Sequence, residues 1–341
     1  MDPQQPAHVL AGWLVPADQR AAYAAAVVKA KQRNPQASEF KGKHLLPTPR
    51  GRETARRIIS GALDVGALPV FVIAEKHYCV AAKIVETFLD PFHNDGAYWL
   101  PTGADIARQA IANVFYGAPS ALLRDFANAY RDPNTESFTR SIQALADYSN
   151  SIGRIDLSSS LLAQIDDLDR LVETERTEIG TIKRNKWIAL NTFTFLSFMV
   201  LASNVIRLET DAEVEVVHDK TDEFEEAFKI LFNGWRWKEG LEILPSVLQS
   251  GTVMPPLVDS LTRFRIGESK QEPEIQAADV LSSTLRWLAE GASIGREGQF
   301  DKELFRLTLW PLLPGFPVQH ASLIASDDWT RRLLRPFREI L

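Results

Sequence analysis

EVEVVHDKTDEFEEAF, residues 213–228, combines two periodicities in one short stretch. Its first part alternates valine with glutamate, which is the two-residue period of a strand with one buried face. From Phe224 onward the apolar residues recur at helical spacing. A strand that leads directly into an amphipathic helix is the repeating unit of α/β proteins. Asp219 stands where the strand ends, and two interpretations stay open: it caps the following helix, or it holds a metal ion.

The same strand–helix alternation extends on both sides of this stretch. The run LPVFVIAEK at 68–76 is apolar without alternation, which is typical of a strand buried on both faces. Residues 38–46 are expected to form a short strand or a turn. Further strands are predicted at 8–15, 213–219 and 260–270, and helices at 17–34, 49–63, 79–89, 222–232, 272–291 and 326–341. The pattern predicts a single α/β domain over residues 1–341.

The middle of the chain, residues 103–208, carries helical periodicity almost throughout. We expect it to form a helical insertion within that domain. The insertion should end in the uncharged run 187–206, which is long enough to cross a bilayer. The asparagine, serine and threonine residues in this run suit a helix buried in protein better than one facing lipid. We therefore expect no membrane span.

Composition excludes several classes of protein. The net charge of −6 argues against indiscriminate nucleic-acid binding, although a local basic patch remains compatible with it. Cys79 is the only cysteine, which excludes a disulfide framework and a thiolate metal cage. The first residues lack the pattern of a signal peptide, so we expect a cytoplasmic protein. The sequence contains no P-loop, dinucleotide fingerprint or G-x-S-x-G motif.

A narrow polar stripe marks the predicted helix at 272–291. Gln276, Asp279 and Ser283 follow helical spacing on an otherwise apolar helix. A carboxylate flanked by alanine and valine is poorly solvated and needs a partner, a proton or a metal. Two interpretations stay open for Asp279: a metal ligand, or a buried Gln–Asp pair that is hydrogen-bonded to backbone.

The most basic part of this acidic chain begins at residue 38. In SEFKGKHLL, Glu39 is followed by Lys41, Lys43 and His44, and a group of arginines that includes Arg52 comes next. Such a run forms either a solvated surface or a surface that contacts phosphate groups beside an acid. Acids beside a basic flank are what metal-assisted phosphodiester chemistry requires. Carboxylate oxygens are hard ligands that suit Mg²⁺ or Mn²⁺.

Four segments occur in an order that resembles a known family. They are HVLAGWLVP (8–16), EFKGKHL (39–45), EVVHDK (215–220) and SKQEPEIQAADVLSS (269–283). The same order of segments is seen in the family called domain of unknown function 3800, which this chain resembles over most of its length except the helical middle. The resemblance implies a ribonuclease H-like fold. It places Asp219 at the end of the fourth core strand, Asp279 on the late helix, and Glu39 in the family's ELK-like turn.

The chain departs from that family at its beginning. Similar proteins usually start with a strand that carries Asp-Glu-Ser, directly before the strand that corresponds to 8–15. Only seven residues precede His8, and Asp2, next to Pro3, cannot take the place of that strand acid. Either the start codon is assigned too late, or the protein lacks this ligand. We expect an open sheet edge at that position.

Two functions are carried forward as hypotheses. The first is a Mg²⁺- or Mn²⁺-dependent nuclease acting on DNA or RNA, in which Asp219, Asp279 and Glu39 are the catalytic and metal-binding acids. The second is a catalytically inactive nuclease-like module that binds a protein or a nucleic acid. In the nuclease, His44 or His218 would move a proton. The expected substrate-binding residues are Lys41, Lys43, His44, Arg52 and Gln276.

Overall fold

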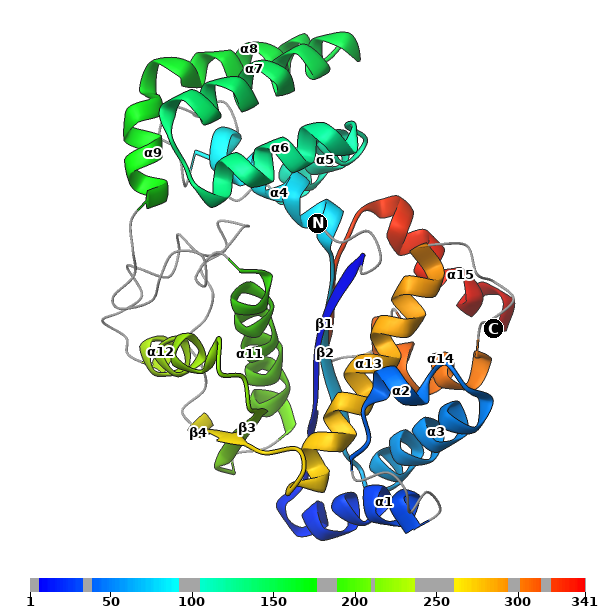
Figure 1. Ribbon diagram of the computed structural model, residues 1–341. Helices are drawn as coiled ribbons and strands as arrows, with labels where there is room; N and C mark the ends of the chain where they lie inside the picture. The colour runs from blue at the N-terminus through cyan, green and yellow to red at the C-terminus, as the bar shows by residue number, and fades with distance from the viewer. Residues whose placement is uncertain are drawn as a thin grey trace. The chain divides into compact units, whose positions relative to one another are not determined.

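The computed structural model describes residues 6–32, 39–91, 105–176, 189–209, 212–236, 261–293, 301–313 and 320–340. The chain is α/β, as predicted, and divides into two compact units. Of the described residues, 75–91, 105–176 and 189 form a helical unit. The remaining described residues form an α/β unit, which contains all the candidate site residues (Figure 1).

A three-stranded sheet organises the α/β unit. Its order is β1 (Ala7–Leu14), β2 (Leu68–Glu75) and β5 (Ala321–Ile324), with β2 and β5 parallel and Phe71 opposite Ala321. All residues of β2 after the first are buried, which confirms the prediction of a strand covered on both faces. β5 was not predicted, because four residues are too short to show a periodicity.

The two faces of this sheet pack against different helices. Val70 and Val72 contact Leu201 and Val205 of α11 (Leu190–Glu209). The alternate residues of β2, Phe71 and Ile73, join a core with α13 (Pro273–Ser293), α14 (Lys302–Leu309) and α15 (Asp327–Ile340). Figure 1 shows α11 on one side of β1 and β2 and α13 on the other. The two-residue period of the strand therefore separates two apolar layers.

β3 (Val214–Asp219) and β4 (Leu261–Gly267) form a separate parallel pair. Asp219 lies opposite Gly267, so both strands end at the same edge. α12 (Glu225–Arg236) follows β3, and its Phe228 stacks on Phe195 of α11 and on Phe224, the residue before the helix. The predicted strand and helix in the opening stretch are confirmed.

β1 lies at the edge of the three-stranded sheet, and no strand within the described residues joins it to β3 or β4. α13 packs closely along β1. The Ser282 hydroxyl donates to the Val9 carbonyl at 3.1 Å, and the Trp13 indole donates to the Ala277 carbonyl at 3.3 Å. The sheet edge expected from the sequence is thus present, and a helix covers part of it.

Three further helices pack on α13. They are α1 (Arg20–Gln32), preceded by the short 3-10 turn Ala17–Gln19, α2 (Gly42–Leu45) and α3 (Pro49–Asp64). Thr48 caps α3 by accepting from the Gly51 amide at 3.0 Å, and Pro49 follows as the first helical residue. In place of the short strand or turn expected at 38–46, residues 42–45 form the one-turn helix α2. Gly42 permits its backbone to approach α13 closely.

The helical unit consists of α4 (Lys76–Leu89), α5 (Asp105–Tyr116), α6 (Ser120–Arg131), α7 (Thr135–Ser151), α8 (Ile155–Leu162) and α9 (Leu168–Arg176), with a 3-10 turn at Ala163–Asp167. Its core contains a ring cluster in which Phe88 meets Phe126 and Phe138 edge to face. Lys83 is partly buried beside it, with its ammonium 2.7 Å from Glu86 and 4.7 Å from the centre of the Tyr130 ring.

The helical unit differs from the insertion predicted at 103–208. It already includes α4, and it excludes α11, whose apolar residues pack on β1 and β2. Leu190–Leu208 is the one helix among the described residues that is long and apolar enough to cross a bilayer. Half of that segment is buried inside the fold, which is also the pattern of a core helix.

Candidate functional site

Asp219 bonds to the loop after β4 and not to the helix that follows it. Its Oδ1 accepts from the amide of Ser269 at 3.3 Å and from the amide of Lys220 at 2.9 Å. The first turn of α12 is instead closed by the backbone carbonyl of Thr221, which accepts from the Glu225 amide at 3.0 Å. The helix-cap interpretation of Asp219 therefore does not apply.

Ser269 connects two of the predicted acids. While its amide donates to Asp219, its hydroxyl donates to Glu39 Oε1. Its carbonyl accepts from the side-chain amide of Gln276. One buried serine after β4 thus fixes the positions of carboxylates that lie far apart in the sequence.

The polar stripe on α13 binds the segment that begins at Glu39. The Gln276 carbonyl oxygen accepts from the Phe40 amide at 3.2 Å, and Asp279 Oδ2 accepts from the Gly42 amide at 3.1 Å. A Cβ added at Gly42 would overlap Ser283, the third member of the stripe. The stripe therefore anchors the backbone of 39–42. For Asp279, the hydrogen bond to backbone foreseen in the second interpretation is present.

Lys41 places an ammonium group beside Glu39. Its Nζ lies 3.0 Å from Glu39 Oε1, and its side chain is 44% exposed where that of Glu39 is 10% exposed. The hydrogen bond that its ammonium donates to Glu39 raises the pKa of Lys41, and the charges of Asp279 and Asp219 add to that rise. Lys41 therefore lies in the electrostatic field of all three carboxylates.

The acids differ in how strongly they hold a proton. Burial raises the pKa of Asp279, and the negative charge of Asp219 contributes, against opposing effects of the Gly42 amide and Lys41. Burial alone would also raise the pKa of Glu39, but the hydrogen bonds from Ser269 and Lys41 outweigh it and lower that pKa. The influence of Asp219 on Asp279 shows that these two carboxylates interact.

The three carboxylates are of the ligand type that Mg²⁺ or Mn²⁺ prefers. Lys41 pairs with Glu39, and the charges of Asp219 and Asp279 also act on its ammonium. In the part of the chain that the structure describes, however, no three His, Cys, Asp or Glu side chains form a group that could hold a metal ion. The chemistry of the side chains thus favours a divalent cation, but their arrangement does not form a metal site.

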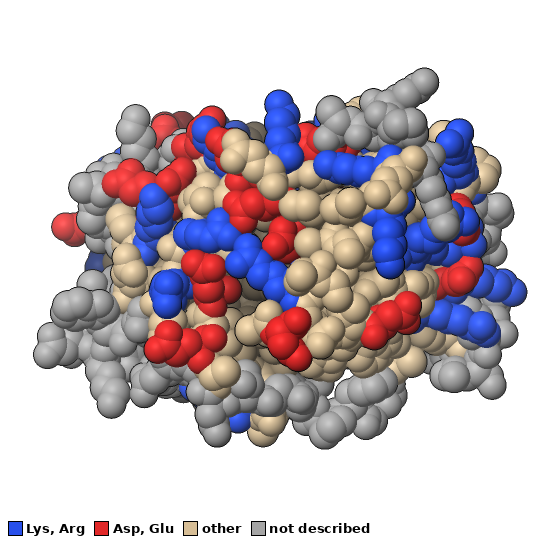
Figure 2. Space-filling model, turned by 90° about the horizontal axis from the view of Figure 1, so that it is seen from below, with Lys and Arg blue, Asp and Glu red and all other residues tan. Residues whose placement is uncertain are grey.

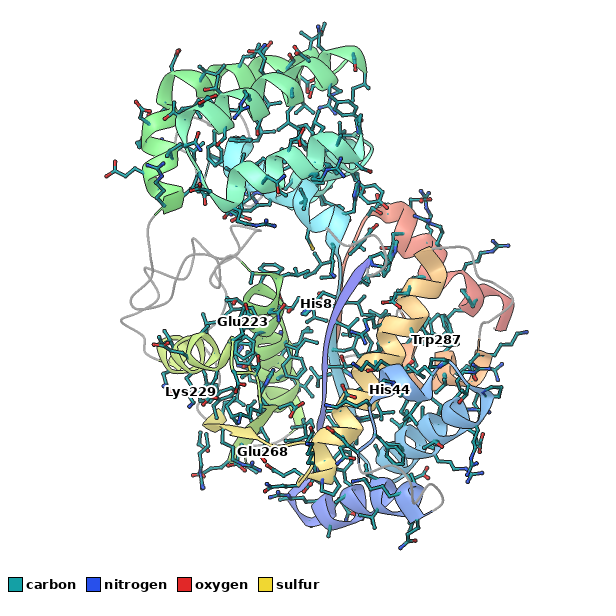
Figure 3. The ribbon with its side chains drawn as sticks, in the orientation of Figure 1. His8, His44, Glu223, Lys229, Glu268 and Trp287 are labelled. Atoms are coloured by element: carbon teal, nitrogen blue, oxygen red, sulfur yellow. The ribbon has the colours of Figure 1, made fainter. Side chains whose placement is uncertain are left out.

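Lys43 and His44 lie on α2 and are exposed. Figure 3 shows His44 on α2 beside α13, and Glu268 directly after β4. The face seen in Figure 2 carries acidic and basic side chains interspersed around a hollow, and not a continuous basic surface. Phosphate contacts on such a face depend on individual lysines more than on a broad positive field.

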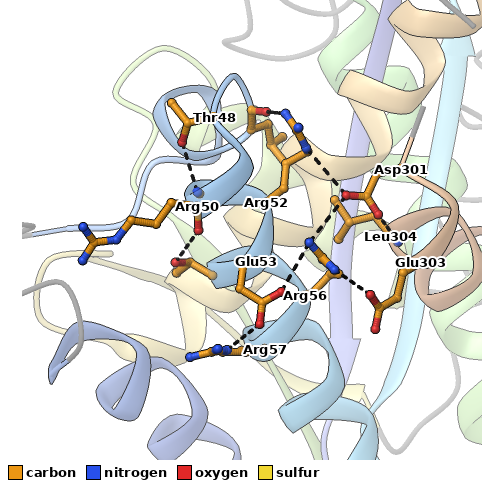
Figure 4. Close-up of polar contacts among 12 residues, drawn as sticks. Thr48, Arg50, Arg52, Glu53, Arg56, Arg57, Asp301, Glu303 and Leu304 are labelled. Atoms are coloured by element: carbon orange, nitrogen blue, oxygen red, sulfur yellow. Dashed lines mark hydrogen bonds and ion pairs between the residues drawn. The ribbon is translucent and has the colours of Figure 1, made fainter. Parts of the chain in front are cut away.

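Arg52 has a structural environment. Its guanidinium donates to the Leu46 carbonyl at 3.0 Å, pairs with Asp301 at 3.6 Å and lies 5.6 Å from the centre of the Trp287 ring. Figure 4 shows that Arg56 and Arg57 are paired as well, with Arg56 reaching Glu303 at 2.6 Å and Arg57 reaching Glu53 at 2.8 Å. These contacts join α3 to the start of α14, and the substrate contact expected for Arg52 stays a prediction.

Gln276 and His218 are also placed differently from what was expected. Gln276 is fully buried. Its side-chain oxygen accepts from the Phe40 amide and its side-chain NH₂ donates to the Ser269 carbonyl, so it holds both segments in position. The centre of the His218 ring lies 4.9 Å from that of Phe228, and burial lowers its pKa. Its Nδ1 lies 2.6 Å from the Asp219 carbonyl, and the charge of Asp219 opposes the effect of burial. Gln276 is too deeply buried to meet a substrate, and the proton transfer expected of His218 stays a prediction.

Ser269 is the site residue that sequence reasoning missed. It lies two residues after the end of β4, where parallel strands bring loops together. That position was the available signal, but a serine in a loop is too common to be singled out.

Comparison of the chain with protein-family models, with curated proteins and with solved structures found no match.

Proposed function

We propose that this protein is a metal-dependent phosphodiester hydrolase of the ribonuclease H-like class that acts on nucleic acid. One observation carries the proposal. Glu39, Asp219 and Asp279 come from three distant parts of the sequence, and Ser269, Lys41 and α13 bring them together. Acids gathered at the carboxyl ends of parallel strands occupy the usual position of an α/β active site.

The topology supports the class at a coarse level. A parallel β3–β4 pair is followed by the long helix α13, which carries the late acid. The order of the four family-like segments agrees with the order of these elements. The ribonuclease H-like assignment and the relation to the domain of unknown function 3800 are parts of this proposal.

In this function Asp219 and Asp279 would hold Mg²⁺ or Mn²⁺, with Glu39 completing the set. The ion supplies Lewis acidity and a water of lowered pKa. The chain's own residues do the positioning: Ser269 orients Glu39 and Asp219, and the Gly42 amide orients Asp279. Lys41 and Lys43 bind the phosphate backbone from the open side of the site.

A second candidate function is favoured by a specific observation. Each acid already accepts from donors of the protein, and the described residues contain no ready metal cluster. Such an arrangement also suits a catalytically inactive module that retains the shape of a nuclease and binds a nucleic acid or a protein.

Cleavage of labelled DNA and RNA with Mg²⁺ or Mn²⁺, and with EDTA, tests the two functions. Asp219→Asn and Asp279→Asn should abolish cleavage. Asp222→Asn is the matched control, because its carboxylate lies close to Asp219 in sequence but is 89% exposed. Absence of cleavage by the folded protein on either substrate refutes the hydrolase, and nucleic-acid binding without cleavage then supports the inactive module.

A further inference from the structure

We propose that α1 is a dimer interface, on which the α1 helix of a second copy of this chain packs in antiparallel orientation. The contact surface consists of the outward face of α1 and of the groove that lies between α1 and α3. This inference is independent of the proposed function. Three properties of α1 carry it: its composition, the shape of its surroundings and the charges at its two ends.

α1 is apolar on its outward face as well as on its inward face. The buried inward side chains are Tyr23, Val27 and Ala30. On the opposite side Ala21, Ala25 and Val28 follow the spacing i, i+4 and i+7, and Val28 is 42% exposed. A surface helix ordinarily carries polar residues on that side, and a helix that is apolar all round is ordinarily covered by protein. The outward face of α1 therefore has the composition of a contact surface.

A groove between α1 and α3 adjoins this face. Its volume is about 470 Å³, and its apolar lining includes Ala22, Ala26 and Gly61. The two helices pack closely along it, since a Cβ added at Gly61 would come within 2.7 Å of the Ala26 side chain. Figure 2 views the side on which α1 lies and shows a broad area of uncharged side chains there. A groove between two helices is the shape into which the side chains of a further helix pack.

The two ends of α1 carry opposite charges. Asp18 precedes the helix and is exposed, whereas Lys29 and Lys31 lie in its last turn. Arg20 also lies at the N-terminal end, but its guanidinium pairs with Glu274 at 2.9 Å. In an antiparallel pair with twofold symmetry, each acidic end lies beside the basic end of the other copy. A second α1 thus complements the first in charge as well as in its apolar face.

The size of the surface predicts a weak dimer. A helix of 13 residues is about 20 Å long. Two packed helices are roughly 20 Å across, so each copy offers on the order of 400 Å². A standard interface buries about 800 Å² per partner. We therefore expect a reversible dimer, whose population rises with protein concentration.

Sedimentation velocity of the full-length protein, from low micromolar to near-millimolar concentration, tests the interface. Val28→Glu introduces a charge into the contact. Ile230→Glu is the matched control, because Ile230 on α12 is exposed to a similar extent, 36% against 42%. Asp18→Lys and Lys29→Glu each reverse the charge at one end of α1, and the double variant exchanges the two charges. Thermal melts establish that every variant is folded.

The wild type and Ile230→Glu should change from monomer toward dimer as the concentration rises. Val28→Glu should weaken the dimer about tenfold or more, because twofold symmetry places two uncompensated charges in the contact. Asp18→Lys and Lys29→Glu should each weaken it several-fold. The double variant should dimerise more tightly than either single variant, since each exchanged end again faces an opposite charge.

A wild-type protein that stays monomeric at every concentration overturns the proposal. Equal dimerisation of Val28→Glu and Ile230→Glu also overturns it, because the dimer then forms through another surface. A double charge variant that dimerises no more tightly than the single variants overturns the antiparallel arrangement of the two helices.

Discussion

Replacement of Gly42 by alanine tests how closely the site depends on the packing of α2 against α13. An alanine Cβ at this position would approach the Cβ and Oγ of Ser283 to less than the 3.0 Å below which real Cβ atoms essentially never meet. α2 must therefore move away from α13. That movement breaks the hydrogen bond from the Gly42 amide to Asp279 and displaces Lys41.

The expected loss of stability has two contributions, the steric overlap and the lost hydrogen bond. Overpacking a tight contact costs about 1–3 kcal/mol, and a hydrogen bond to a charged group contributes roughly 1.5–3 kcal/mol. Because α2 is short and relieves part of the strain by moving, we expect Gly42→Ala to lower the free energy of unfolding by about 3 kcal/mol. Urea denaturation followed by tryptophan fluorescence measures this difference.

A double-mutant cycle separates the steric cause from others. Ser283→Gly removes the opposing Cβ and alone should cost about 1 kcal/mol, because glycine weakens a helix interior. In the double variant the two losses should not add, and a coupling energy of at least about 1 kcal/mol is expected. Gly291→Ala in the same helix is the control: a Cβ there meets nothing within 4 Å, so it should be neutral or stabilising. Additive losses, or a stable Gly42→Ala protein, would refute the reasoning.

Three further predictions concern titration and reactivity. Ser269→Ala should raise the pKa of Glu39 toward its ordinary value, because the hydroxyl that stabilises the carboxylate is lost; carboxyl ¹³C NMR titration measures it, and an unchanged pKa contradicts the contact. Since the pKa of Glu39 is lowered on folding from the ordinary 4.5, its stabilisation is fully present above that value and lost as the pH falls through the lowered pKa. Glu39→Gln should therefore cost stability near pH 7 and less toward roughly pH 3, and a constant difference in urea denaturation across this range would disprove the linkage. Burial, with a contribution from the charge of Glu75, raises the pKa of Cys79 to about 12. The only thiol in the chain should therefore react slowly with an aromatic disulfide reagent in the native protein and rapidly in urea. Equal rates would show that the thiol is not shielded.

Lys41 balances part of the negative charge of these acids by pairing with Glu39 at 3.0 Å. Burial, with a contribution from the charge of Asp219, raises the pKa of Asp279.

Local pattern alone was sufficient for most strands and helices of the α/β unit. β2 was predicted from an uninterrupted apolar run and β3 from alternation. Successive side chains of a strand point to opposite faces, so the pattern of apolar residues shows which faces are buried. The stripe on α13 was also visible in the sequence, since helical spacing places Gln276 and Asp279 on one side.

The division into units was not predictable in the same way. α11 reads as a helix in isolation, and only its contacts with Val70 and Val72 assign it to the α/β unit. β5 is defined by its pairing with β2 and has no sequence pattern of its own. The unit to which α11 belongs and the strand character of β5 both depend on contacts with residues that are distant along the chain.

For the candidate site, the kinds of groups were visible in the sequence: three acids, a neighbouring lysine and a run of arginines. The fold was needed to show that Ser269 joins Glu39 to Asp219, that the Gly42 amide bonds to Asp279, and that Arg52 pairs with Asp301. Charge and periodicity are local properties of the sequence, whereas the partner of a charged group depends on loops and helix faces that meet only in the folded chain.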